Sequence, residues 1–182
     1  DGDDAGPAQG LVVVGDDVVI GGAAVADTDL GGGPLSASCD AYAMAFLARL
    51  SGDDGAVVWS RALSTWGANG TRLFLDPAGH VVMVGDMLGP TDLGGGLFPG
   101  DHGTYSATYD AETGTFLGSR DIVEIGKKDG PSELGTWGIA TSAIDSKGRL
   151  VLQNNFFGTY TSGEGLLTSD GWGDVLFVRL PQ

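Results

Sequence analysis

The hexapeptide TDLGGG occurs twice in this chain, at Thr28–Gly33 and at Thr91–Gly96, 63 residues apart. The apolar segments upstream keep the same spacing, because DVVIGG begins at Asp17 and HVVMVG begins at His80. Self-similarity at a fixed spacing indicates a tandem structural unit whose copies stack on one another. The repeat therefore constrains the fold more than any other feature of the sequence.

Further downstream, FLARLSGDDGAVVWSRAL (Phe46–Leu63) aligns with YSATYDAETGTFLGSRDI (Tyr105–Ile122). Each of these two units then closes on TWG, at Thr65–Gly67 and at Thr136–Gly138. A third unit begins with SAIDSKGRLVLQNNFFG, which resembles RLFLDPAGHVVMVGDMLG of the second unit. Its segment DVLFVRL resembles AMAFLARL of the first unit. We expect a flexible acidic N-terminus over 1–9, repeat units over 10–67 and 68–138, and a third unit over 139–182 that lacks its last strand.

Short β-branched and aromatic runs alternate with tight turns along each unit. The segments Asp76–Gly79, Asp110–Gly114 and Asp145–Gly148 fit a type I turn followed by a glycine with positive φ. Each unit is therefore predicted to form four short antiparallel strands in up-and-down order, and no amphipathic helix is evident. Repeats of this kind predict an all-β fold of tandem four-stranded blades, an incomplete β-propeller. A β-sandwich is the alternative.

Composition narrows the classes of partner. The chain has 182 residues, 33 of them glycine, and a formal net charge of −15. Phosphate backbones would be repelled by such a charge, so nucleic acid is disfavoured as a partner. No apolar run approaches the roughly 20 residues that a membrane-spanning helix needs. The single cysteine, Cys39, excludes an intrachain disulfide. Another protein chain, or further blades of the same polypeptide, are the partners that we expect.

With these segments in view, the chain resembles the bacterial β-propeller repeats known as SBBP repeats. The matching pieces are LDPAGHVVMVG, GDVLFVRL and GAVVWSRAL. The resemblance implies a propeller blade fold and a surface, periplasmic or extracellular location, and it carries no catalytic motif. The units are degenerate, since Gly118 stands where the first unit has Trp59 and TYTSGEG replaces TDLGGG in the third unit. A hexapeptide that drifts in this way is predicted to be a structural turn rather than a ligand loop.

Acidic turns are the candidates for a metal site. Carboxylates in glycine-rich loops can supply the oxygen ligands that Ca²⁺ prefers, and Asp27, Asp29 and Asp92 are the candidates. No complete EF-hand loop is present. The two histidines, His80 and His102, are too few for a zinc centre. Calcium is therefore a possible ligand, and no other cofactor is expected.

The sequence shows no Gly-x-Ser-x-Gly elbow and no sialidase-type Asp box, so no catalytic residue is assigned and an enzyme is not expected. The tryptophans at 59, 66, 137 and 172 are predicted to pack between sheets. Because the third unit stops before its fourth strand, an open strand edge is expected near Asp174, Val175, Leu176, Phe177 and Val178, unless the residues belong to a longer polypeptide. The leading hypothesis is a non-catalytic protein-binding or scaffold module. The alternatives are a calcium-stabilised extracellular adhesion or structural protein and a propeller-type hydrolase.

Overall fold

The structure is a computed structural model that describes residues 8–25, 27–36, 44–63, 69–87, 89–97, 103–124, 141–156, 159–162, 165–168 and 174–179. These residues form strands and their connections, and they contain no helix. It follows that no helix in this part of the chain is long and apolar enough to cross a membrane. The predicted all-β class is confirmed.

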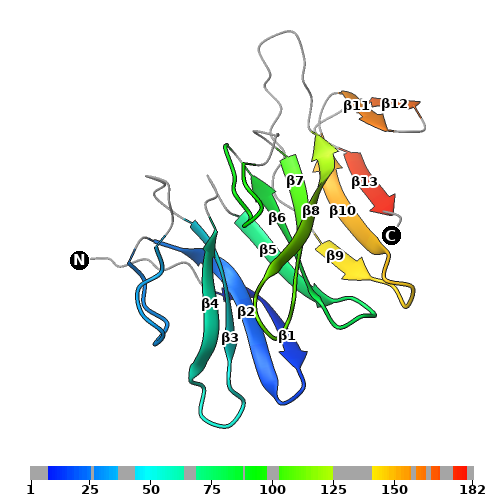
Figure 1. Ribbon diagram of the computed structural model, residues 1–182. Helices are drawn as coiled ribbons and strands as arrows, with labels where there is room; N and C mark the ends of the chain where they lie inside the picture. The colour runs from blue at the N-terminus through cyan, green and yellow to red at the C-terminus, as the bar shows by residue number, and fades with distance from the viewer. Residues whose placement is uncertain are drawn as a thin grey trace.

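The strands form two four-stranded antiparallel sheets and a smaller third sheet (Figure 1). The first sheet contains β1 (Ala8–Val14), β2 (Asp17–Ala24), β3 (Met44–Leu50) and β4 (Val57–Leu63). The second sheet contains β5 (Asn69–Leu75), β6 (Val81–Met87), β7 (Gly103–Tyr109) and β8 (Phe116–Glu124). In both sheets the strands follow chain order, which confirms the predicted up-and-down connectivity.

The third sheet is smaller and has the order β13-β10-β9. Its strands are β9 (Thr141–Ile144), β10 (Leu150–Phe156) and β13 (Asp174–Arg179). A separate hairpin of β11 (Thr159–Ser162) and β12 (Gly165–Thr168) lies between β10 and β13 in the chain, where the other two units carry TDLGGG. The segments 1–7, 65–67 and 136–138 and the residues Cys39, His102 and Trp172, named in the sequence predictions, lie outside the described residues.

The predicted hairpin turns form as expected. Gly79, Gly114 and Gly148 have φ of 85°, 67° and 75°. In each turn the N–H of the glycine donates to the carbonyl of the aspartate that opens it, at 2.9 Å. A residue with a Cβ would be strained at these angles, so the glycine determines where the chain can reverse.

The repeat alignment holds in three dimensions. Val19 of β2 pairs with Arg49 of β3, and Val82 of β6 pairs with Thr108 of β7. In the third sheet Val151 of β10 pairs with Arg179 of β13. Because these pairs occupy matching places in the sequence repeat, each residue of one sheet has a defined equivalent in the next. The strands β3 and β7, and likewise β4 and β8, are related by 59 residues.

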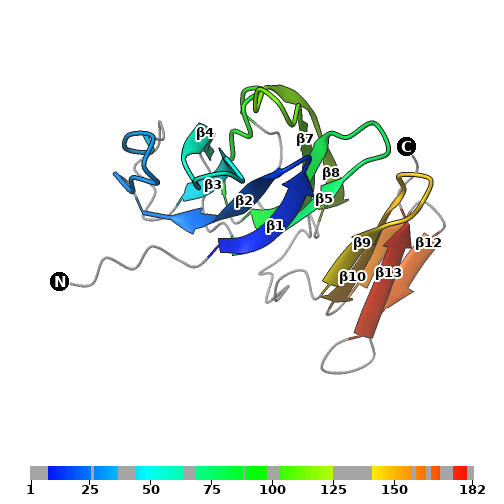
Figure 2. The same ribbon diagram turned by 90° about the horizontal axis from the view of Figure 1, so that it is seen from below.

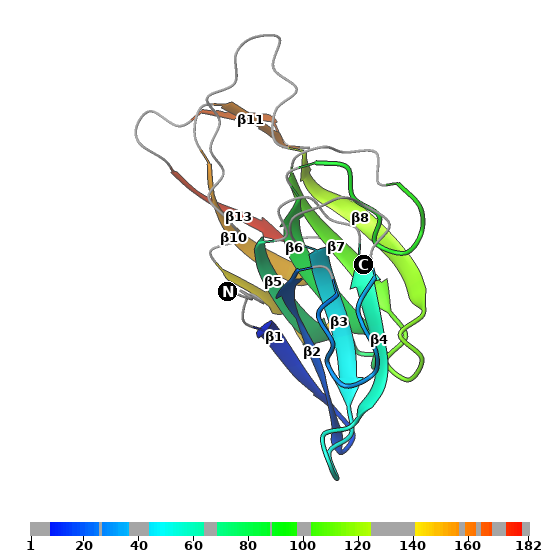
Figure 3. The ribbon, with the colours of Figure 1, turned by 90° about the vertical axis from the view of Figure 1, so that its left-hand side faces the viewer.

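The three sheets stack in chain order (Figures 2 and 3). We call the face of a sheet that looks toward the preceding sheet its back face, and the opposite face its forward face. The forward face of the first sheet packs on the back face of the second in the largest apolar cluster. Its members are Val19, Ala45, Leu47, Trp59, Leu63, Leu73, Val81, Met83, Met87, Leu93, Tyr105, Ala107, Tyr109 and Ala111. A second cluster, Val82, Val84, Ile122, Leu150 and Leu152, joins the second and third sheets.

The first strands of the sheets approach one another most closely. β1 lies against β5, and β5 lies against β9. Gly10 of β1 permits this approach, because a Cβ there would lie 2.9 Å from Leu73 Cγ and 3.3 Å from the carbonyl oxygen of Thr71. Beside it, the backbone N–H of Thr71 donates to Gln9 Oε1 at 2.9 Å.

Among the described residues, the buried hydroxyl of Tyr105 has no hydrogen-bond partner, and a Cβ at Gly85 would lie 2.6 Å from it. Burial raises the pKa of this hydroxyl far above its ordinary value. The equivalent residue of the first sheet is Phe46, so the repeat itself accepts a ring without the hydroxyl. We expect Tyr105→Phe to increase the free energy of unfolding by up to about 1 kcal/mol, measured by urea unfolding.

The matched control is Tyr109→Phe. The Tyr109 hydroxyl donates to the carbonyl of Leu93 at 2.8 Å, so its removal is expected to cost about 1 kcal/mol. A loss of stability in Tyr105→Phe equal to that in Tyr109→Phe would contradict the prediction.

Candidate functional site

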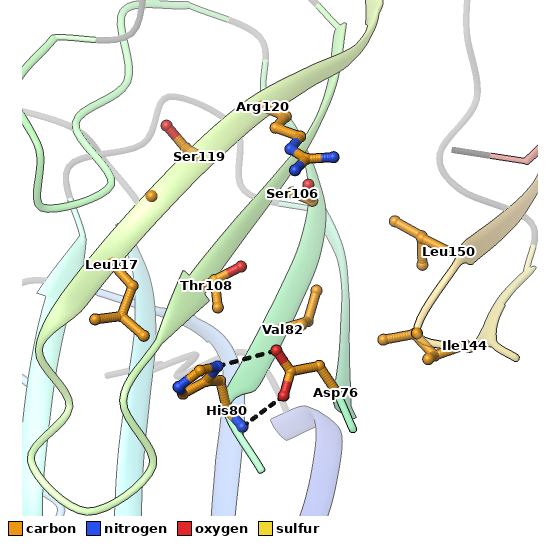
Figure 4. Close-up of a pocket in the computed structure, with 12 residues that line it drawn as sticks. Asp76, His80, Val82, Ser106, Thr108, Leu117, Ser119, Arg120, Ile144 and Leu150 are labelled. Carbon is orange, nitrogen blue, oxygen red and sulfur yellow. Dashed lines mark hydrogen bonds and ion pairs between the residues drawn. The ribbon is translucent and has the colours of Figure 1, made fainter. Parts of the chain in front are cut away.

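A cleft lies between the second and third sheets and encloses about 430 Å³ (Figure 4). The second sheet contributes mostly polar side chains together with Val82 and Leu117, and the third sheet contributes the apolar Ile144 and Leu150. Ile144 and Leu150 point from the third sheet toward the gap, opposite Val82 and Arg120. The complete lining is Asp76, His80, Val82, Ser106, Thr108, Leu117, Gly118, Ser119, Arg120, Ile144, Gly148 and Leu150.

The pair Asp76 and His80 is the main candidate for chemistry in this cleft. Asp76 Oδ1 accepts the backbone N–H of Ala78 at 2.9 Å and that of His80 at 2.8 Å. Asp76 Oδ2 lies 3.0 Å from His80 Nδ1. Partial burial raises the pKa of the Asp76 carboxyl, but the backbone and ring of His80 more than offset this and hold it below its ordinary value.

The next hairpin repeats this arrangement with an arginine. Asp145 Oδ1 accepts the backbone N–H of Lys147 at 2.9 Å and that of Arg149 at 3.0 Å. Asp145 Oδ2 accepts from Arg149 Nε at 2.7 Å. His80 and Arg149 thus occupy the same place in two equivalent hairpins and bind the same aspartate oxygen. Because arginine cannot act as a general base, the role that the two residues share is to close the hairpin.

The hydroxyl groups that line the cleft belong to Ser106, Thr108 and Ser119. An activated serine or threonine needs a base within about 2.6–3.2 Å. Among the described residues, the ring of His80 has Asp76 as its hydrogen-bond partner and no hydroxyl. The cleft therefore offers a concave surface of polar and apolar side chains that includes the guanidinium of Arg120.

The two TDLGGG segments form the same loop. Asp29 Oδ1 accepts the backbone N–H groups of Gly31 and Gly33 at 2.7 and 2.9 Å. In the second copy, Asp92 Oδ1 accepts from Gly94 and Gly96 at 2.8 and 3.0 Å. All four glycines have φ between 97° and 104°. This geometry fits a structural turn organised by the aspartate side chain.

The three metal candidates are placed as follows. Asp27 is exposed and has a φ of 66° in the first-sheet loop that also contains Asp29. Asp92 belongs to the corresponding loop of the second sheet. Within the described ranges, no three His, Cys, Asp or Glu side chains gather around one point. A cation at Asp29 or Asp92 would also compete with two N–H groups that already point at the carboxylate.

The predicted strand edge coincides with β13. Asp174, Val175, Leu176, Phe177 and Val178 all pair with β10, from Asp174 opposite Phe156 to Val178 opposite Leu152. β13 is the last strand of its sheet in the described part of the chain, and no strand there pairs with its other edge.

Sequence reasoning missed a set of contacts that joins the first and second sheets. The turn Asp110–Gly114, which connects β7 to β8, lies against the forward face of the first sheet. Arg49 Nη1 donates to the carbonyl of Ala111 at 3.0 Å, and Trp59 Nε1 donates to the same oxygen at 3.2 Å. Both donors are buried, as Trp59 was predicted to be.

A third donor completes this arrangement. Arg61 Nε donates to the carbonyl of Gly114 at 3.2 Å, and its Nη2 donates to that of Thr113 at 3.0 Å. We call Arg49, Trp59 and Arg61 the turn clamp. Arg61 belongs to the Ser-Arg pair that recurs at Ser119-Arg120 in the aligned segment. This repeated pair is the sequence signal that could have identified Arg61 as a member of the turn clamp.

Acid is expected to destabilise the protein through its turn carboxylates. The Arg149 side chain lowers the pKa of Asp145 from 3.8 to about 2, and hydrogen bonds from Thr113 lower that of Asp110. The backbone N–H of Gly52, followed by Arg49, lowers the pKa of Asp17. A depressed carboxyl pKa contributes stability above the unfolded value, and this is lost as pH falls through the folded value. Thermal melting should therefore show Tm falling between pH 3.8 and about 2.

Asp145→Asn is the variant that checks the acid prediction. It removes one titrating group, so the slope of Tm against pH over that window should be shallower than in the unaltered chain. An unchanged slope would contradict the assignment of Asp145.

A scan against models of known protein families finds no match for this chain, and a search of curated proteins finds none either.

Proposed function

We propose that this chain is a non-catalytic scaffold and protein-binding module built from blades of the β-propeller type, similar to SBBP repeats. Successive four-stranded sheets stacked face to face support this architecture. So does the approach of β1, β5 and β9, because the first strands of propeller blades converge on a central axis. We place the module at a cell surface, in a periplasm or outside the cell, on the resemblance alone.

The observation that carries the proposal is the back face of the first sheet. Leu73 and Leu75 lie on the back face of the second sheet and pack against the first sheet. Their register equivalents in β1 are Leu11 and Val13, since Leu11 pairs with Ile20 and Leu73 pairs with Met83. Leu11 is 59% exposed and Val13 is 57% exposed. At β1, the first sheet thus exposes two apolar positions whose equivalents in the second sheet pack against another sheet.

An exposed apolar strip of this kind marks an interaction surface. The partner that fits this strip is the forward face of another unit. In the second sheet, the forward face of the first sheet covers Leu73 and Leu75, which are the equivalents of Leu11 and Val13. The cleft chemistry supports a non-catalytic role as well, since its histidine repeats the place of a structural arginine.

Sedimentation velocity over a range of protein concentrations tests the proposal. The unaltered chain should associate as its concentration rises, and the double variant Leu11→Asp, Val13→Asp should remain monomeric with an unchanged Tm. Leu97→Asp is the control, because Leu97 is 76% exposed in a loop of the second sheet and should leave association unaltered. A chain that stays monomeric at all concentrations, or a double variant that still associates, would remove the main support for the scaffold role.

The calcium-stabilised alternative has a separate test. Melting with Ca²⁺ and with a chelator should give the same Tm, because Asp29 and Asp92 already bind the amides of their own loops. A Tm that rises with Ca²⁺, and that loses this response in the Asp92→Ala variant, would favour the alternative. The hydrolase alternative has no described nucleophile paired with a base.

A further inference from the structure

The cleft between the second and third sheets lies where the repeat places the ring of Trp59 at the first interface. In the first sheet, Arg49 of β3 pairs with Trp59 of β4. In the second sheet, Thr108 of β7 pairs with Gly118 of β8. The two pairs are equivalent, because the strands are related by 59 residues. Thr108 and Gly118 both line the cleft, so a hydroxyl and a hydrogen atom stand there in place of a guanidinium and an indole.

The opposite wall of the cleft is repeated as well. Leu75 pairs with Val81 beside the turn between β5 and β6. Ile144 pairs with Leu150 beside the equivalent turn between β9 and β10. Val81 is fully buried in the apolar cluster that contains Trp59, and Leu75 packs against that cluster. The same kind of aliphatic pair therefore accompanies an indole at the first interface and lines the cleft at the second.

The size and the lining of the cleft suit a small aromatic ligand. Its volume is about 430 Å³, and small-molecule sites typically enclose about 300–1,000 Å³. Leu117, Ile144 and Leu150 supply apolar surface against which a flat ring can pack (Figure 4). The hydroxyls of Ser106 and Thr108 belong to the same lining and can accept a hydrogen bond from an N–H group. Apolar walls with a few polar groups are typical of sites for small organic molecules.

The charge of the chain favours a neutral ring over an anionic one. The formal net charge is −15, and Asp76 is one of the residues that line the cleft. Both would repel a ligand that carries a carboxylate or a phosphate. The side chain of Trp59 is itself neutral and donates through its Nε1 to a carbonyl oxygen. The first interface therefore offers an indole as the pattern for the ligand.

We propose that the cleft is a binding site for a small neutral aromatic molecule of the indole class. The ring lies beside Gly118, in the place that Trp59 has in the repeat, and packs against Ile144 and Leu150. Its N–H donates to the hydroxyl of Thr108, the cross-strand partner of Gly118. This activity is separate from the protein-binding role proposed above, since it uses neither face of the first sheet.

The test titrates indole into the isotope-labelled chain and follows the backbone amides by NMR. Saturable shifts are expected at Gly118, Ile144 and Leu150, with a Kd on the order of 1 mM, because one buried ring and one hydrogen bond supply the affinity. Gly118→Trp restores the residue of the first unit and should weaken binding by about tenfold or more, because its side chain occupies the place of the ligand. Gly118→Ala is the matched control and should keep the Kd within about twofold, since a methyl group takes up little of the cleft.

A second variant covers the case in which Gly118→Trp does not fold. Thr108→Arg restores the other residue of the first-unit pair and should also weaken the binding of indole. No described atom lies within 4 Å of the point where a Cβ of Gly118 would be, so Gly118→Ala should keep the Tm of the unaltered chain.

Three results would overturn the proposal: no saturable shift, shifts confined to residues outside the cleft, or equal Kd values for the unaltered chain and the folded variants that fill the cleft. The double variant Leu11→Asp, Val13→Asp should bind indole with unchanged Kd. Failure of the aromatic site is therefore distinguishable from failure of self-association.

Discussion

Replacing Trp59 with alanine should lower the free energy of unfolding by about 3–5 kcal/mol, measured by urea unfolding followed by circular dichroism. The indole is 9% exposed and lies in the apolar cluster between the first and second sheets. Its Nε1 also donates to the carbonyl of Ala111, which would remain buried without this donor. The variant therefore loses packing and one hydrogen bond together.

The ring of Trp59 also fits closely against Gly114. A Cβ at Gly114 would lie 2.8 Å from Trp59 Cε3, and the φ of Gly114 is 67°. Trp59→Phe is the control that separates the two contributions, because it keeps an aromatic ring and removes the donor. We expect it to cost about 1–2 kcal/mol. A loss below about 1 kcal/mol in Trp59→Ala would show that the two sheets do not depend on this ring.

Replacing Arg49 with alanine should cost about 2–3 kcal/mol, the second largest effect that we expect. Arg49 Nε donates to Asp17 Oδ2 at 2.8 Å, and Nη1 lies 2.7 Å from Glu112 Oε2. The same Nη1 donates to Ala111. The Arg49 side chain is only 11% exposed, so its guanidinium is largely removed from water. Asp17 and Glu112 keep access to water. The free energy of unfolding lost with Arg49 is therefore expected to be smaller than for a fully buried ion pair.

Arg61→Ala provides the matched comparison for Arg49→Ala. Arg61 binds the same turn but is exposed, so its loss should cost less than about 1 kcal/mol. A double-mutant cycle of Arg49→Ala with Asp17→Asn measures the part of the loss that belongs to this pair. Equal losses for Arg49→Ala and Arg61→Ala would contradict the burial argument.

The strands and their turns were predictable from the sequence, because their signals are local. An aspartate and a glycine three or four residues apart determine a hairpin, as at Asp76–Gly79 and Asp145–Gly148. The repeat of TDLGGG and of the strand patterns then predicted the four-stranded up-and-down units. These features depend on backbone sterics and on hydrogen bonds within a few residues.

The candidate site was predictable only in part. The strand at Asp174–Val178 followed from the alignment of the repeats, because DVLFVRL resembles AMAFLARL of the first unit. The clamp did not, because Arg49 and Trp59 lie about fifty to sixty residues from the carbonyl of Ala111 that they bind. The replacement of Trp59 by Gly118 in the second unit is visible in the repeat alignment, but the cleft also depends on another sheet that lies opposite these small residues.

By itself, the sequence determined the all-β class, the unit length and the positions of the turns. The tertiary structure decided which face of each sheet is covered and which donors meet which turn. It also decided that Leu73 is buried while its equivalent Leu11 is exposed. The physical reason is that hairpins form from contacts between neighbours in the chain, whereas burial and clamping depend on whether another sheet lies against the face concerned.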